Sequence, residues 1–544
     1  MLLTAPPPQQ PVPQGTGVEP YVDEYANSAP PPREPLPPSS RSTAVSSSAT
    51  IVESSPAINE LPVEMVELEL PLYTVRLTNR GAGIDSWLLS EFRESSDPTS
   101  PHVQLITGEA PARTALVTPF EELGLGDLSA RVFQIVDRDL DRVVFETTDR
   151  DITIRKTFTF DSDSYSFRIV LEVVNGSTEM IAPRFRIDLP AHIRDGSDFS
   201  EIGLAAMKDG SDEIELLRSI GQAGFLSSLT GERAERYTKF SAPVDWAAVQ
   251  TTYFVSAIVA DNPSQASVWL EALDPGKAGI AELFFDEIQI PAGSSYTREL
   301  KAYFGPKELD RLTAFGGDLV RSIDLGWSWV EPLTKIFATF LEALYSIIPN
   351  YGVAIVILTI LVRIVTAPLT IKQMRSMERM RALSPKLKEI QKEHADDRAK
   401  QSELTMALYK SEGVNPLGGC LPMVLQFPVF IGLFYALRST IQLRQSPFFG
   451  WIDDLASPDM LFEIPGLGLP VRVLPLIMGA TMVLQQKITP MQADPAQAKM
   501  MMTIMPIMMT FVFYTFPSGL VLYWMVSNLL AIGHQLLIGR GMRK

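Results

Sequence analysis

The feature that constrains this chain most is a long uncharged run near its C-terminus. No Asp, Glu, Lys or Arg occurs between residues 500 and 538, a run of 39 residues. As one straight helix this run would be about 58 Å long, whereas the hydrocarbon core of a bilayer is about 30 Å thick. The run must therefore fold back, and the turn-forming residues Pro517, Ser518 and Gly519 predict where it does so. Two membrane spans follow, at about 500–516 and 518–538.

Three other apolar segments predict three further spans. Residues 351–371 contain a single charge, and residues 417–437 contain none. The segment at about 472–488 is shorter, but the basic side chains at its two ends can reach opposite membrane surfaces and lengthen it. Residues 349–544 are therefore predicted to form a polytopic α-helical membrane domain with five transmembrane helices.

The region before these spans has a different composition. Residues 1–60 are rich in Pro, Ser, Ala and Gln, which predicts a disordered tether, because such a segment cannot bury enough apolar surface to fold. From 61 to 310 the pattern changes to short runs of alternating branched and aromatic residues, such as ITIRKTFTF and YSFRIVLEVVN, separated by turn sequences. This alternation predicts an all-β sandwich domain of antiparallel strands.

Between the two regions, at 324–348, the apolar period changes from two to that of a helix. Trp327 and Trp329 stand near its start, and acidic and basic residues avoid the apolar side. This predicts an amphipathic helix in the headgroup region of the membrane, with the two tryptophans as interfacial anchors. A core helix of the preceding β domain remains the alternative.

The distribution of charge predicts the orientation. Residues 1–350 carry 28 Lys and Arg against 51 Asp and Glu, whereas residues 351–544 carry 19 against 12. Ten of the basic residues lie in 372–410, and the C-terminus is basic, whereas 439–471 holds only Arg444. The positive-inside rule places the first loop and the C-terminus in the cytoplasm. Five spans then leave the β domain outside.

A domain on the outer side needs an export signal. The first five residues are followed at once by prolines, so they contain no charged region and no adequate apolar stretch. We expect that an N-terminal anchor helix is missing from this sequence through truncation or a late start. The alternative is that the domain is exported without such a helix.

Arg363 is the most informative single residue in the predicted spans. It lies about 18 Å along its predicted span, near the middle of the bilayer, where a guanidinium costs roughly 2.5–3.5 kcal/mol unless it faces water or a partner. No Asp or Glu occurs in any of the five predicted spans to pair with it. A water-filled cavity between the helices is one solution, and a side chain that snorkels to the cytoplasmic headgroups is the other.

Other residues of the spans are candidates for the same cavity or for an apolar surface beside it. Polar candidates for the cavity, each of which can also form an ordinary interhelical hydrogen bond, are Thr359, Gln426, Gln486 and Asn528. Soft methionines crowd the fourth span and suit a surface that accepts many apolar partners, although core packing explains them equally well. The predicted apolar sliding surface consists of Phe427, Phe430, Phe434, Met505 and Met509.

Several long strings resemble a known family. From 327 to 544 the chain contains LVRIVTAPLT, LYKSEGVNPLGGCLPMVLQFPVF, LRQSPFFGWIDDL, MVLQQKITP and FPSGLVLYWMVSNL, which resemble the membrane core of the YidC, Oxa and Alb insertases. VRLTNRGAGIDSWLL and FGPKELDRL are similar to the large periplasmic β-supersandwich of the Gram-negative members. By this resemblance Arg363 matches the family's groove arginine, and Thr359 and Trp524 match other groove positions, although the family often has Tyr where Trp524 stands.

The resemblance implies a membrane protein insertase of the bacterial inner membrane, without bond-making catalysis. Implied partners are nascent membrane proteins, the lipid bilayer, the Sec translocon with its accessory subunits and, weakly, the ribosome through the cytoplasmic loops. The segment 372–412 is predicted to form a charged helical hairpin that serves as a landing site, or else a solvated charged loop. We expect no cofactor and no nucleotide, because no Walker A string occurs.

Two other classes of function remain open on the residues alone. A transporter or channel would also place a charge in a cavity inside the membrane. An intramembrane enzyme would need a nucleophile and a base, or metal ligands, within the spans, and His534 is the only imidazole there. We expect no catalytic residue and no metal site, because the four histidines are scattered and no CxxC motif occurs.

Overall fold

The computed structural model describes residues 61–541 apart from 109–113, 193–201, 209, 217–219, 221–236, 275, 395–396, 414–420, 467 and 489–494. The predicted tether at 1–60, the start of the predicted span at 417–437 and the side chains of Met500, Met501 and Met502 lie outside the described residues.

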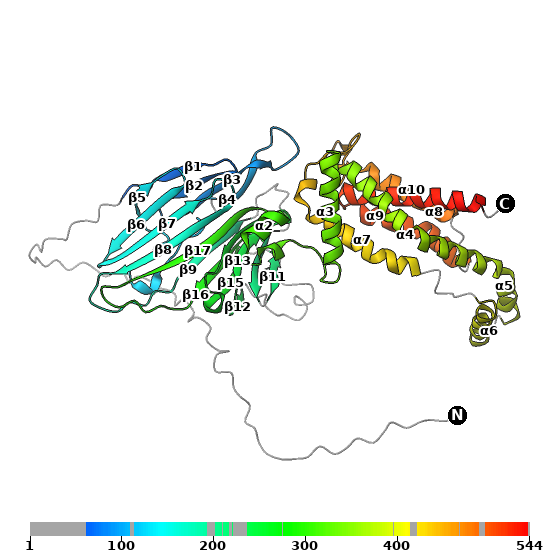
Figure 1. Cartoon of the computed structure of the whole chain (residues 1–544), viewed down its shortest axis with the longest axis horizontal. Helices are drawn as coiled ribbons and strands as arrows, with labels where there is room; N and C mark the ends of the chain where they lie inside the picture. Colours follow the sequence, from blue (N-terminus) through cyan, green and yellow to red (C-terminus); the bar gives the residue numbers. More distant parts are fainter. Residues whose placement is uncertain are drawn as a thin grey trace, which may run out of the picture. The chain divides into compact units, whose positions relative to one another are not determined.

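The first part of the described chain is all-β and antiparallel, as the alternating pattern predicted (Figure 1). Within the described residues the largest sheet has nine strands, in the order β11-β10-β13-β14-β17-β8-β7-β6-β5. In chain order these are β5 (Gln134–Arg138), β6 (Arg142–Asp149), β7 (Ile152–Phe160), β8 (Ser166–Asn175), β10 (Gly203–Lys208), β11 (Ser211–Leu216), β13 (Trp246–Gln250), β14 (Phe254–Val259) and β17 (Ser295–Pro306).

Two smaller sheets, each of four strands among the described residues, pack against this large sheet. The first contains β1 (Met65–Glu69), β2 (Tyr73–Thr78), β3 (Gly83–Arg93) and β4 (His102–Thr107). The second, in the order β12-β15-β16-β9, contains β9 (Arg186–His192), β12 (Tyr237–Phe240), β15 (Ala266–Asp274) and β16 (Ala278–Phe285). One apolar core joins them, and Trp87 of the first sheet contacts Phe167 and Phe304 of the large sheet at ring distances of 5.2 Å.

The second part of the described chain is helical. A short helix, α2 (Leu309–Phe315), follows the last strand of the β domain, and the remaining helices come after it. They are α3 (Glu331–Ile347), α4 (Tyr351–Ala382), α5 (Ser384–Glu393), α6 (Arg398–Ser411), α7 (Leu421–Ser439), α8 (Val473–Ile488), α9 (Pro495–Phe513) and α10 (Ser518–Gly541), with a small hairpin of β18 (Phe462–Ile464) and β19 (Leu469–Val471) before α8.

Several helix boundaries differ from the predicted ones. The helix predicted from residue 324 begins only at Glu331, because Gly326 adopts a positive φ of 83° and Pro332 stands in the first turn, where proline is tolerated. The predicted span 351–371 matches the apolar stretch Tyr351–Ile371, but the helix α4 that contains it continues into the charged segment as far as Ala382. The fold-back between α9 and α10 does lie at Pro517.

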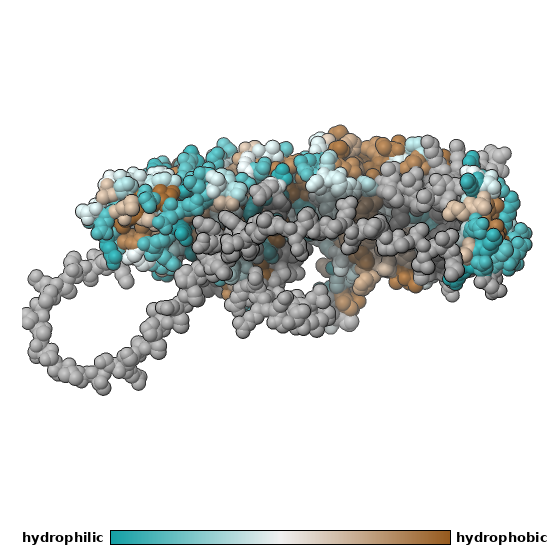
Figure 2. All heavy atoms as spheres, turned by 90° about the horizontal axis from the view of Figure 1, so that it is seen from below, coloured by the Kyte–Doolittle hydropathy of each residue, from teal (hydrophilic) through white to brown (hydrophobic). Residues whose placement is uncertain are grey.

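Only some of the predicted spans are both long enough and apolar enough to cross a membrane. Among the described residues, two helices are long and apolar enough to cross a membrane, at Tyr351–Ile371 and Ser518–Leu536. Val473–Ile488 and Thr503–Phe513 are apolar but shorter. On the face drawn in Figure 2, apolar residues gather over the helical part, whereas hydrophilic residues dominate the β domain and the region of α5 and α6. Five transmembrane helices therefore remain a prediction.

The helices α3, α4, α7, α8, α9 and α10 form one packed bundle, and α5 and α6 lie beyond the end of α4 (Figure 1). In it α10 packs against α4 and α8, α8 packs against α9, and α3 packs against α7 and α4. The buried core includes Leu358 on α4, Leu433 on α7, Met478 on α8 and Val521 on α10. This arrangement brings the inner faces of α4, α7 and α10 together.

A loop after α7 contacts the β domain. Ile441 is 3% exposed and belongs to the apolar core of the β domain. Arg444 Nη2 donates to the backbone oxygen of Glu94 at 3.0 Å, and Gln445 Nε2 donates to that of Arg93 at 2.8 Å. The β domain is thus held at the end of a bundle helix by packing and by polar contacts.

Candidate functional site in the helical bundle

The structure brings Arg363 of α4 against α10. Arg363 Nε donates a hydrogen bond to Ser527 Oγ at 2.9 Å, and Nη2 donates to the same hydroxyl. Ser527 is buried at 6% exposure, whereas Arg363 is partly exposed. The guanidinium therefore has one hydroxyl partner on the neighbouring helix and keeps part of its surface accessible.

A second polar contact joins the same face of α10 to α7. Gln426 Nε2 donates to the Tyr523 hydroxyl at 3.0 Å, and Tyr523 stands one turn before Ser527. Tyr523 also interacts electrostatically with Arg363. Arg363, Gln426, Tyr523 and Ser527 thus form one group from three helices, which we call the polar cluster.

The other predicted polar candidates do not belong to the polar cluster. Thr359 is completely buried, and its hydroxyl donates to the Ile355 oxygen of its own helix at 2.6 Å. Asn528 Nδ2 donates to Thr481 of α8 at 3.3 Å, on another side of α10. Gln486 Oε1 is buried and has no hydrogen-bond partner among the residues that the structure describes. Of the predicted polar set, Arg363 and Gln426 therefore share the polar cluster through their contacts with α10.

Trp524 lies beside the polar cluster, in an aromatic contact. Its ring meets Phe430 of α7 edge to face at 5.0 Å, and it meets Phe513 of α9 at 5.1 Å. The phenolic hydroxyl beside Arg363 on α10 belongs to Tyr523, one residue before Trp524. Trp524 therefore belongs to the apolar wall next to the cluster.

The predicted sliding surface divides between exposed and packed residues. Phe427 is 49% exposed, whereas Phe430, Phe434 and Met509 are partly buried against the bundle core, and Met505 is also partly buried. On α9 the exposed apolar residues include Ile504, Ile507, Met508 and Phe511.

Sequence analysis missed Tyr523 and Ser527. Each looks like an ordinary polar residue in an apolar helix, and neither carries a charge that demands an explanation. Their spacing of four does place them on one helix face, where both can meet a partner helix. That spacing was the available signal, but it does not say which helix supplies the partner.

The electrostatics of the polar cluster are those of an unneutralised cation. Among the residues that the structure describes, no carboxylate forms an ion pair with Arg363, and Tyr523 is its electrostatic neighbour. A hydroxyl partner satisfies some N–H groups but leaves the positive charge in place. The arrangement can attract an anionic or dipolar group. No cluster of His, Cys, Asp or Glu that could hold a metal ion occurs in the described part of the chain.

Fold and site together define a class of protein: a helical membrane domain with an attached β domain and a cationic polar cluster between its helices. A family model described as "60Kd inner membrane protein" matches residues 343–544, and one described as "YidC periplasmic domain" matches residues 65–340.

Individual relatives agree with these matches. The membrane protein insertase YidC of Pelobacter propionicus is 33% identical over 533 residues, which cover 94% of this chain and 95% of that protein. That of Geobacter metallireducens is 33% identical over 542 residues, or 95% of each. The match to a crystal structure of an active YidC insertase covers 87% of this chain and 93% of that chain, at 17% identity and a TM-score of 0.36.

The chain therefore belongs to the YidC family of membrane protein insertases. This family is not an enzyme family, and its membership places the chain at the bacterial inner membrane. The resemblance noted in the sequence is confirmed, and a transporter or channel is not favoured.

Proposed function

We propose that this chain moves newly made hydrophobic segments from water into the bilayer, and that the polar cluster lowers the barrier for the polar end of each segment. The observation that carries the proposal is Arg363, a partly exposed guanidinium with a hydroxyl partner and no paired carboxylate among the described residues. In a site of low dielectric constant, such a charge attracts an acidic group far more strongly than it would in water.

The barrier is lowered without a pore. A substrate's polar outer segment advances into a hydrated space between α4, α7 and α10, so it never faces the full hydrocarbon thickness. The charge of Arg363 holds an acidic residue of this segment on its way across. The space remains open on one side to the cytoplasm and to lipid.

The apolar part of the substrate follows a different route. It slides along α7 and α9, where Phe427 and Met508 are exposed and Phe430 and Trp524 stand behind them. Soft and aromatic side chains suit a surface that must accept many sequences. The segment then enters lipid, because burial of its own apolar area is favourable by roughly 25 cal/mol per Å².

The proposed topology has five transmembrane helices, at α4, α7, α8, α9 and α10. The segment of α5 and α6 and the C-terminus lie in the cytoplasm, and the β domain lies in the periplasm. The basic loops support this orientation. Nascent membrane proteins are the substrates, delivered alone or with the Sec translocon and its accessory subunits, and ribosomes are contacted weakly by the cytoplasmic loops.

Site-specific crosslinking tests the proposed function. A photoreactive residue is placed at Phe427, Phe430 or Met508, and a ribosome-stalled nascent membrane protein is then presented to vesicles that contain the full chain. Crosslinks are expected from all three positions. The matched control is Leu140, an apolar residue of the β domain with 86% exposure, which should give none. Equal crosslinking from Leu140 and the bundle positions would contradict the proposed route.

A further inference from the structure

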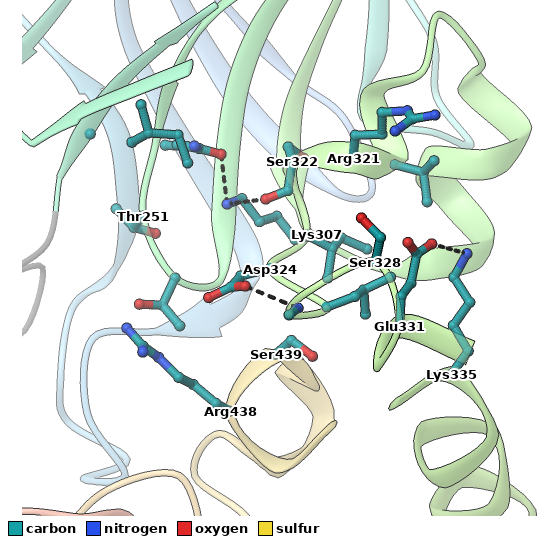
Figure 3. Close-up of a pocket in the computed structure, with 18 of the residues that line it drawn as sticks. Thr251, Lys307, Arg321, Ser322, Asp324, Ser328, Glu331, Lys335, Arg438 and Ser439 are labelled. Atoms are coloured by element: carbon teal, nitrogen blue, oxygen red, sulfur yellow. Dashed lines mark hydrogen bonds and ion pairs between the residues drawn. The ribbon is translucent and has the colours of Figure 1, made fainter. Parts of the chain in front are cut away.

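A second site lies away from the polar cluster. A pocket of about 790 Å³ opens where the end of β13, the segment after η3 (Leu319–Ser322) and the end of α7 meet (Figure 3). Its lining is mainly polar and carries charges of both signs. The residues that matter for its chemistry are Thr251, Lys307, Ser322, Asp324, Arg438 and Ser439.

The cationic side of this pocket is built from buried groups. Lys307 is 6% exposed, and its Nζ donates to Gln250 Oε1 and to the Ser322 oxygen, both at 2.8 Å. The Ser322 hydroxyl is buried and has no hydrogen-bond partner among the described residues. One side-chain amide oxygen and one backbone oxygen therefore hold the Lys307 ammonium in place at the pocket wall.

The opposite charge stands close to a second cation. Asp324 lies on the segment after η3, where its Oδ1 accepts a hydrogen bond from the Gly326 backbone at 3.2 Å. Arg438 extends from the end of α7 below it (Figure 3). Asp324 and Arg438 both interact electrostatically with the Tyr435 side chain, which places them around the same ring.

The segment that carries Asp324 has a fixed shape. Gly326 adopts a φ of +83°, and a Cβ at that position would lie 2.4 Å from the Tyr435 ring. Only glycine fits such a close approach in this backbone conformation. The relation between Asp324 and the end of α7 is thus formed in advance of any ligand.

The pocket lies at the level of lipid headgroups in the proposed topology. Arg438 is the first charged residue after the uncharged part of α7, so it marks the outer end of that helix. Trp327 and Trp329 stack at 6.0 Å beside the pocket and are 53% and 57% exposed. Exposed tryptophans of this kind prefer the membrane interface.

We propose that this pocket binds the zwitterionic headgroup of an aminophospholipid from the outer leaflet. The lipid phosphate lies against Arg438 and Lys307, with the hydroxyls of Thr251 and Ser439 as further donors. The lipid ammonium lies against Asp324. A charged pair that matches both ends of one headgroup favours phosphatidylethanolamine over an anionic lipid, because the anionic lipid leaves Asp324 unmatched and adjacent to its phosphate.

The inference rests on the proposed topology, but its test does not depend on insertion activity. The full chain is purified in detergent, stripped of lipid and titrated with phosphatidylethanolamine or phosphatidylglycerol, and retained lipid is counted by native mass spectrometry. We expect phosphatidylethanolamine to bind on the order of tenfold more tightly. Asp324→Asn should remove this preference, and Arg438→Gln should weaken both lipids. The matched control is Arg472→Gln, an arginine outside the pocket, which should change neither.

Soluble competitors identify the source of the headgroup. Glycerophosphoethanolamine should compete with the lipid, whereas inorganic phosphate at the same concentration should not. Displacement by inorganic phosphate alone would show a free-anion site and overturn the proposal. Equal lipid retention in Arg438→Gln and Arg472→Gln would overturn it as well, whatever the two variants do to insertion.

Discussion

The Ser527 hydroxyl accepts hydrogen bonds from two nitrogens of Arg363, and this contact joins α10 to α4 in the bundle. A single hydroxyl holds the guanidinium in one orientation without cancelling its charge. The charge therefore stays available, while the direction in which it points is fixed.

Removal of the hydroxyl should separate these two effects. Ser527→Ala leaves the charge but frees its orientation, and a hydrogen bond to a charged group contributes about 1.5–3 kcal/mol. We expect insertion to fall by less than in Arg363→Ala, and the bundle to unfold at lower temperature. Thr359→Val is the matched control, because the Thr359 hydroxyl bonds its own helix, and it should have little effect on insertion. A larger loss in Thr359→Val than in Ser527→Ala would contradict this account.

Ile441 should stabilise the contact between the β domain and the loop after α7. Because its side chain is buried in the β-domain core, Ile441→Ala is expected to cost about 2–4 kcal/mol of packing. The contact between the domain and the loop after α7 should loosen, so that protease cleaves the segment 323–330 faster. Ile336→Ala changes an exposed residue of α3 and serves as the control. If both variants are cleaved at the wild-type rate, Ile441 does not anchor the domain.

At Lys156 the alternating strand pattern predicts which face of the strand is buried, but it does not predict the hydrogen-bond partners of the side chain. The alternation in ITIRKTFTF places Ile154, Lys156 and Phe158 on one face, and all three are buried. The atoms that receive the ammonium are not in that pattern: Lys156 Nζ donates to the Leu116 oxygen and to Thr118 Oγ1. Such contacts between distant segments depend on tertiary packing, which a local period does not encode.

Lys156 should make the stability of the β domain depend on pH. Burial lowers its pKa to about 7, from 10.5 for an ordinary lysine, although Asp188 opposes the shift. Between about pH 7 and 10.5 Lys156 is protonated in the unfolded chain but neutral in the folded one. The free energy of unfolding therefore rises with pH across this window and is lowest below pH 7. Lys156→Met should remove this slope and raise the melting temperature at pH 7 by several degrees, since each kcal/mol corresponds to roughly 2–4 °C in a domain of this size.

The control for this measurement is Lys301→Met, which changes an exposed lysine of β17 and should leave the slope in place. Melting is followed for the β domain within the full chain. A wild-type melting temperature that stays constant from pH 7 to 10 would contradict the role of Lys156.

The bundle site was predictable to a similar extent. Arg363 could be found from sequence because a charge within an apolar span is costly and demands a reason. Gln426 was included because it is polar in another span. Their partners on α10 were not found, because helix rotation in a bundle is set by packing, and several polar residues of one helix are equivalent in sequence. The predicted start of α3 was too early for a related reason. The helical period of apolar residues begins at residue 324, but the positive φ of Gly326 interrupts a helix, and Pro332 is tolerated only in the first turn, so α3 begins at Glu331.

The most direct test of the central claim uses pairs of client proteins that differ only in one acidic residue of the outer segment. Insertion into vesicles is measured for the wild type, Arg363→Lys, Arg363→Ala, and Arg363→Ala combined with Gln426→Arg. If Arg363 acts by attraction, the lysine variant should retain much of the activity, because the charge remains. The alanine variant should lose on the order of tenfold for the acidic client and less for its neutral partner. The arginine at position 426 should restore part of the loss, because Gln426 belongs to the same polar cluster. Near-normal insertion of both clients by Arg363→Ala, unaffected by the charge at 426, would show that Arg363 only snorkels to the membrane surface and would contradict the account.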